Sequence, residues 1–182
     1  VCIGPGALEK LPGYVEEYGY HKPYIICDEI TYKVAAQRCE ELLEARGIKA
    51  VTKKLSHLGF DEATLGEIVI GMPIDCDLMI GVGTGSITDM LRYSSYKLHL
   101  PCFTVATGAP MDGFAASIGI MNVNNLKATM QAHNTEIIIG DTDILVCNAG
   151  ISQFGLMSMT SAEVWDRVFD VNVKGMYHCI NA

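Results

Sequence analysis

Short apolar runs alternate with longer amphipathic segments along most of this chain. Near-continuous apolar runs between turn residues are typical of strands buried on both faces, whereas apolar residues at helical spacing indicate helices that cover a sheet. The alternation predicts β-α-β units and a parallel sheet. The expected strands are Pro23–Asp28, Ile48–Lys54, Asp77–Gly83 and Pro101–Thr107, and the expected helices are Ala7–Tyr18, Thr31–Arg46, Asp61–Met72 and Ser86–Leu98.

Helix and turn signals support several of these boundaries. Gly47 follows the second helix as an expected C-cap, and Asp61 precedes the third as an expected N-cap. Within the second helix, four apolar residues occur at helical spacing, namely Val34, Cys39, Leu42 and Leu43.

A β-hairpin is expected after the last of these strands. The runs Ile118–Val123 and Leu126–Gln131 flank Asn124-Asn125, a pair that tolerates the positive φ angles of a tight turn. Towards the end of the chain, Ile144–Cys147 predicts a buried strand and Thr160–Glu163 predicts a capping box that opens a helix. We therefore expect an α/β fold with a Rossmann-like, mostly parallel sheet, flanking helices and a hairpin, extended by a C-terminal strand-helix unit.

Composition and net charge exclude some classes of function. The chain has 182 residues, of which 49% are hydrophobic, and a formal net charge of -8. A nucleic-acid groove or an anionic membrane surface would need a basic patch, so neither partner is expected. The seven cysteines are scattered without a C-x-x-C motif, as buried reduced thiols would be. No apolar run approaches the roughly 20 residues that span a bilayer, and a cytoplasmic location is expected.

The segment GVGTGS is the first part of the sequence that indicates a binding site. Gly81, Gly83 and Gly85 would let backbone N–H groups approach an anion, and the helix expected from Ser86 would turn its positive N-terminal end to the same place. A pyrophosphate cradle is one interpretation. The spacing is not G-x-G-x-x-G, so a tight turn without a ligand is the other.

Four motifs in order, GPGALEKL, YIICDEITY, IGVGTGSITDMLRY and VATGAPMDGFAAS, resemble the glycerol-1-phosphate dehydrogenases within the iron-containing alcohol dehydrogenase superfamily. The resemblance covers residues 1–140 and implies a dinucleotide-binding domain. It implies that the cofactor pyrophosphate lies on the loop residues Gly83, Thr84, Gly85 and Ser86.

The same resemblance assigns Asp28 to the adenosine ribose. A carboxylate there accepts hydrogen bonds from the ribose hydroxyls and repels a 2′-phosphate, so NAD is expected rather than NADP. A helix-capping or merely solvated Asp28 is the alternative.

Further residues follow from the resemblance. Asp89 matches an acidic position near the cofactor, with Arg92 where the family usually has lysine. Thr104 and Thr107 could meet phosphate or ribose at a strand end, or serve ordinary packing. Asp112 matches an aspartate beside the nicotinamide and the substrate hydroxyls of a polyol phosphate.

The resemblance also implies a second, helical domain with an aspartate and two histidines that hold zinc or iron, and the sequence has no match to it. The five histidines are dispersed without paired spacing. No metal site is therefore expected.

Residues 141–182 resemble an internal fragment of a short-chain dehydrogenase/reductase, through CNAG and DVN. The resemblance matches Asn148 to a strand-end motif and Asn172 to a catalytic asparagine, but scaffold roles are preferred for both. The fragment lacks its own glycine-rich loop and a following Tyr-x-x-x-Lys pair; Tyr93 and Lys97 have that spacing, but on the wrong side of it. A junction within Gly140–Leu145 predicts a chimera.

Three functions are expected in order of preference. The first is an NAD(H)-binding module derived from oxidoreductases, without complete catalytic machinery. The second is an active NAD-dependent oxidoreductase of a polyol phosphate, and the third is a folded or partly folded chimera with no ligand. Apolar surface left by truncation would favour self-association.

Overall fold

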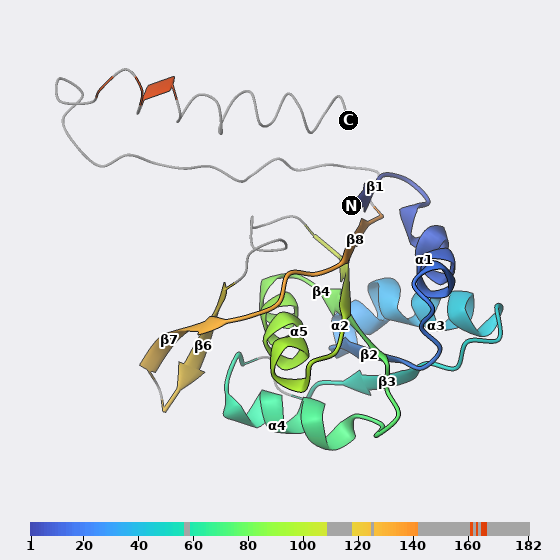
Figure 1. Cartoon of the computed structure of the whole chain (residues 1–182), viewed down its shortest axis with the longest axis horizontal. Helices are drawn as coiled ribbons and strands as arrows, with labels where there is room; N and C mark the ends of the chain where they lie inside the picture. Colours follow the sequence, from blue (N-terminus) through green and yellow to red (C-terminus); the bar gives the residue numbers. More distant parts are fainter. Residues whose placement is uncertain are drawn as a thin grey trace.

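A computed structural model describes residues 1–56, 59–108, 118–124 and 126–141, together with Ser161, Glu163, Trp165 and Asp166. Six strands form a sheet in the order β1-β8-β5-β4-β2-β3, and every pair of neighbours in it is parallel. Helices flank this sheet, and β6 and β7 form a separate two-stranded sheet (Figure 1). The expected Rossmann-like α/β fold is confirmed, while most of its C-terminal strand-helix unit lies outside the described residues.

The elements have the following bounds. The strands are β1 Cys2–Ile3, β2 Pro23–Cys27, β3 Val51–Lys54, β4 Leu78–Gly83, β5 Cys102–Ala106, β6 Ile118–Val123, β7 Leu126–Gln131 and β8 Ile137–Gly140. The helices are η1 Ala7–Lys10, α1 Leu11–Glu17, α2 Glu29–Thr31, η2 Tyr32–Ala36, α3 Gln37–Glu44, α4 Glu62–Gly71 and α5 Gly85–Leu98. No helix in this part of the chain is long and apolar enough to cross a membrane.

The central strands are buried on both faces because helices cover both sides of the sheet. In β2, Ile25 and Cys27 belong to the apolar cluster shared with α1 and α3, whereas Tyr24 and Ile26 belong to the cluster shared with α4 and α5. Figure 1 shows these two pairs of helices on opposite sides of the sheet. The apolar run at 23–27 is therefore continuous, since alternate side chains enter different clusters.

The second helix departs from its sequence-based description in two ways. It begins at Glu29, two residues early, and Tyr32–Ala36 forms a π-helical turn before α3. A π turn contains more residues than an α turn, which changes the direction of the side chains before it relative to those after it. Val34 is consequently 61% exposed and does not share the buried face of Cys39 and Leu43.

The hairpin and the predicted helix caps agree with the structure. Strands β6 and β7 pair antiparallel, and Asn124 has the positive φ angle of 51° that the tight turn requires. Gly47 has a φ of 76° after α3, and the Asp61 side chain accepts a hydrogen bond from the Thr64 amide. These positions were predictable because local backbone chemistry decides them.

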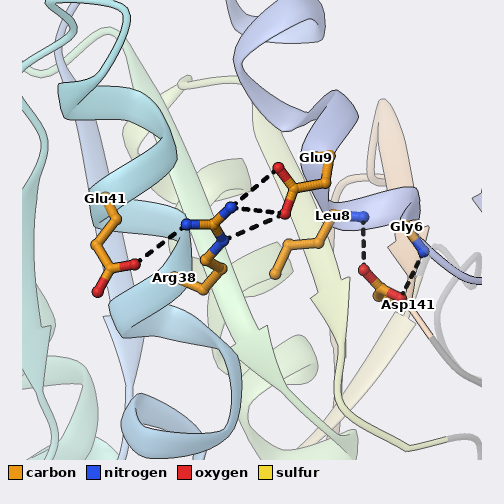
Figure 2. Close-up of polar contacts among 6 residues, drawn as sticks. All are labelled: Gly6, Leu8, Glu9, Arg38, Glu41 and Asp141. Atoms are coloured by element: carbon orange, nitrogen blue, oxygen red, sulfur yellow. Dashed lines mark hydrogen bonds and ion pairs between the residues drawn. The ribbon is translucent and has the colours of Figure 1, made fainter.

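Asp141 ties the beginning of the chain to the end of β8. Its carboxylate accepts hydrogen bonds from the backbone N–H groups of Gly6 and Leu8, each at 3.0 Å (Figure 2). Nearby, Arg38 of α3 donates to Glu9 of η1 and also to Glu41. Residues 1–10 are thereby joined to both the sheet edge and α3.

The described cysteines are free, and four of them are buried: Cys27, Cys39, Cys76 and Cys102. Burial raises the pKa of the Cys27 and Cys39 thiols to about 12 and raises those of Cys76 and Cys102. Thiolates are the reactive species, so these four thiols should react slowly in the folded protein.

We expect a thiol reagent at pH 8 to modify Cys2, which is only half-buried, much faster than these four cysteines. Peptide mass spectrometry after timed labelling would measure the modification rate of each cysteine. Urea-unfolded protein is the control, in which every cysteine should react. Labelling of Cys27 or Cys39 in the folded protein at the rate of Cys2 would contradict the burial.

Candidate functional site

The carboxyl ends of β2, β4 and β5 lie side by side at one edge of the sheet. The pairs Ile26↔Gly81 and Gly83↔Ala106 align these strands so that they end at nearly the same level. Asp28, Thr84 and Thr107 are the residues that directly follow the three strands. Ligands of open α/β sheets bind at this edge, so the fold brings three of the sequence-predicted residues together where a ligand is expected.

Only Thr84 separates β4 from α5, and the N-terminus of α5 lacks a side-chain cap. Thr84 makes no side-chain cap hydrogen bond, in contrast to Asp28 and Asp61, which cap α2 and α4. Ser86, in the first turn, is exposed. The first turn of a helix presents backbone N–H groups without intrahelical acceptors and a positive dipole end. This end of α5 therefore suits an anion such as a phosphate.

Two of the loop glycines are required by packing. A Cβ atom on Gly83 would lie 2.6 Å from Ile87 Cδ1 and 2.9 Å from Ile87 Cβ. A Cβ atom on Gly81 would lie 2.8 Å from Leu91 Cδ2. Both neighbours belong to α5, so these glycines let the helix lie directly against β4. Close packing of α5 on β4 therefore explains Gly81 and Gly83 without a ligand. For Gly85, the choice between a tight turn and a pyrophosphate cradle stays a prediction.

Asp28 is mostly buried and caps α2. Its Oδ1 accepts hydrogen bonds from the Ile30 and Thr31 amides, both at 2.7 Å, and its own amide donates to Thr31 Oγ1 at 3.0 Å. These bonds form a capping box. The capping alternative from the sequence is therefore present in the structure. The ribose role of Asp28 stays a prediction.

Asp89 and Arg92 connect α5 to the hairpin. The Arg92 side chain is fully buried, and its Nη2 donates to Asp89 Oδ1 and, at 3.1 Å, to the Ile118 carbonyl oxygen of β6. Sequence reasoning missed this anchoring role. The acidic and basic residues at i and i+3 were a signal for the pair, but nothing local could identify the carbonyl of β6.

The other predicted residues are distributed as follows. Thr104 lies within β5, is fully buried, and has its Oγ1 2.8 Å from Thr135 Oγ1, which favours the packing role. Thr107 is half-buried, and its amide donates to the Gly83 carbonyl at 3.2 Å. Asp112, Asn148 and Asn172 lie outside the described residues.

Metal-ligating side chains are not clustered in the part of the chain that the structure describes. No group of three or more histidine, cysteine, aspartate or glutamate residues there is arranged to hold a metal ion. The expectation of no metal site for the whole chain stays a prediction.

Comparisons with known proteins identify similar sequences and folds. Residues 2–148 match the family model described as iron-containing alcohol dehydrogenase. The glycerol-1-phosphate dehydrogenase [NAD(P)+] of Bacillus licheniformis is 31% identical over 82% of this chain and 38% of its own length. The enzyme of the same name from Halalkalibacterium halodurans is 33% identical over 79% of this chain and 37% of its own. The chain thus spans less than two fifths of these relatives.

Solved structures support the same fold. Glycerol dehydrogenase from Schizosaccharomyces pombe superposes with a TM-score of 0.71 at 19% identity, over 82% of this chain and 38% of that one. Alcohol dehydrogenase from Oenococcus oeni gives a TM-score of 0.67 at 17% identity, over 76% of this chain and 43% of that one. The family match extends to residue 148, past the junction expected within Gly140–Leu145. The short-chain dehydrogenase resemblance and the chimera have no support in these comparisons.

Proposed function

Because this chain belongs to the iron-containing alcohol dehydrogenase family, we propose that it is an NAD(H)-binding module whose dinucleotide lies across the carboxyl ends of β2, β4 and β5. The observation that carries the proposal is the N-terminus of α5, which has no side-chain cap and follows the strand beside Asp28. The residues proposed for the pyrophosphate are those predicted from the sequence: Gly83, Thr84, Gly85 and Ser86.

Each proposed residue acts through its own groups. The backbone N–H groups of Gly85 and Ser86 would donate to phosphate oxygens, while Gly83 acts by letting α5 approach β4. Asp28 Oδ1 is engaged by α2, which leaves Oδ2 as the acceptor proposed for the ribose hydroxyls. Thr107 directly follows the neighbouring strand β5 and is proposed for the nicotinamide side. A bound nicotinamide would supply hydride chemistry.

We propose binding, rather than turnover, as the property of these 182 residues by themselves. These 182 residues span 37–38% of the length of the relatives named as glycerol-1-phosphate dehydrogenases, so the proposal concerns this part alone. Residues 1–140 are proposed as the dinucleotide-binding domain and 141–182 as a further segment, into which the family match extends as far as residue 148. Active oxidation of a polyol phosphate, with Asp112 beside the substrate, is the second candidate function, favoured by the names of the relatives.

The binding proposal is tested by isothermal titration with NADH of wild type and Ser86→Asp. An aspartate in the first turn of α5 interacts favourably with the helix dipole, so stability should be unchanged or rise by about 0.3–1 kcal/mol. The same charge repels a pyrophosphate, and we expect NADH affinity to fall at least about tenfold. If the variant is at least as stable as wild type but binds NADH more weakly, the loss of affinity comes from the phosphate site and not from damage to the fold.

Ala63→Asp is the matched control. Ala63 is an exposed residue in the first turn of α4, so this variant makes the same change in net charge at a different helix N-terminus. It should leave NADH affinity unchanged. Equal heats for wild type and Ser86→Asp, or no binding by wild type, would contradict the assignment.

Turnover is tested separately. Wild-type protein is mixed with NADH, dihydroxyacetone phosphate and added zinc, and the absorbance of NADH is followed. We expect no consumption above a protein-free control. Sustained consumption that depends on dihydroxyacetone phosphate would overturn the inactive-module proposal in favour of the second candidate function.

A further inference from the structure

Lys54 ends the strand that pairs with β2, the strand that Asp28 follows at the proposed cofactor site. It is the last residue of β3, and its register partner in β2 is Cys27, the residue directly before Asp28. The next amide along, that of Leu55, donates to the Cys27 carbonyl at 2.8 Å, which keeps the two strand ends together. Lys54 thus ends β3 at the level of Cys27, and Asp28 follows one residue later on the neighbouring strand.

The Lys54 ammonium group is held in place by the helical segment that Asp28 caps. Its Nζ lies 3.4 Å from the centroid of the Tyr32 ring and 4.0 Å from Glu29 Oε1. The ring is itself fixed, because the Tyr32 hydroxyl donates to Glu40 at 2.9 Å. The Lys54 side chain is still 39% exposed. A cation over an aromatic ring keeps its charge and can still donate hydrogen bonds to a second partner.

The negative charge of Asp28 is partly compensated. Its Oδ1 accepts two backbone N–H bonds at the positive end of α2, so its repulsion of a nearby phosphate is weaker than that of a free carboxylate. The sequence-based expectation that Asp28 excludes a 2′-phosphate does not take this compensation, or Lys54, into account.

We propose that Lys54 is the residue that contacts the 2′-phosphate of the adenosine ribose when the bound dinucleotide is NADPH. The inference rests on the proposed function, since it needs the adenosine end of the dinucleotide near Asp28. Lys54 supplies a positive charge and N–H donors to the extra phosphate, and it has no corresponding role towards the ribose of NADH.

The test measures dissociation constants of NADH and NADPH by isothermal titration for wild type, Lys54→Met and Lys54→Gln. Loss of a charge-assisted phosphate contact should weaken NADPH binding about tenfold or more, while NADH binding changes less than about twofold. Adenosine 2′,5′-bisphosphate and adenosine 5′-monophosphate, used as fragments, should show the same difference. Either neutral variant that folds is sufficient for the test.

Lys53→Met is the control. Lys53 is adjacent in β3, but its Nζ bonds to Glu67 of α4 at 3.1 Å, on the opposite face of the sheet. This variant should leave the ratio of NADPH to NADH affinity unchanged, and Lys54→Arg should preserve that ratio approximately. If wild type binds neither dinucleotide, the proposed function fails and the inference fails with it. If wild type binds NADH but NADPH affinity is unaffected by loss of the Lys54 charge, the inference alone is wrong.

Discussion

Replacing Arg92 with methionine is expected to lower the free energy of unfolding by roughly 3–5 kcal/mol, the usual range when one partner of a buried ion pair is removed. The guanidinium is fully buried and is hydrogen-bonded to both Asp89 and the Ile118 carbonyl. Methionine fills similar space but donates no hydrogen bond, so the 17%-exposed Asp89 side chain would keep a poorly solvated charge. Urea unfolding followed by circular dichroism measures the change.

A double-mutant cycle identifies the cause. Combining Arg92→Met with Asp89→Leu removes both charges, and we expect the double variant to recover much of the lost stability. Arg38→Met is the surface comparison, because Arg38 pairs with Glu9 and Glu41 at about half exposure and should matter far less. An Arg92→Met protein that is as stable as Arg38→Met would show that the buried pair does not anchor the hairpin.

Gly83→Ala is expected to destabilise the protein by roughly 1–3 kcal/mol through overpacking. The new methyl group would meet Ile87 Cδ1 at 2.6 Å and Ile87 Cβ at 2.9 Å. A Cδ1 atom can move by rotation, but a Cβ atom moves only with the backbone, so α5 would have to shift away from β4. NADH affinity should fall as well, since the N-terminus of α5 moves with the helix. Thermal unfolding and isothermal titration measure the two effects.

Gly13→Ala is expected to have the opposite effect on stability. Gly13 lies in α1, and a Cβ atom there has no heavy atom within 4 Å. Alanine is a better helix former than glycine, so this variant should gain about 0.5–1 kcal/mol. If Gly83→Ala behaved like Gly13→Ala, α5 would not depend on a close approach to β4.

Much of the fold was predictable from the sequence because it depends on burial and local backbone chemistry. The strands at 23–27, 78–83 and 102–106 are visible as apolar runs, since helices on both sides of the sheet require apolar side chains at consecutive positions. Asp61, Gly47 and Asn124 mark a helix start, a helix end and a hairpin turn through preferences of their own backbones.

Other parts could not be predicted because they depend on residues distant in sequence. The pairing of β1 with β8 and the bonds from Gly6 and Leu8 to Asp141 join segments more than 130 residues apart. Val34 was misplaced because a π turn leaves no clear mark in the order of apolar and polar residues.

The candidate site was also predictable only in part. The glycine-rich turn and the acid after the first long strand were evident from the sequence, since each is a short motif with a direct chemical meaning. Only the tertiary structure decided that Gly83 serves the packing of α5, that Thr104 pairs with Thr135, and that Arg92 turns to the hairpin. Residue type determines which bonds a side chain can make, but the partner within reach is determined by how the chain folds.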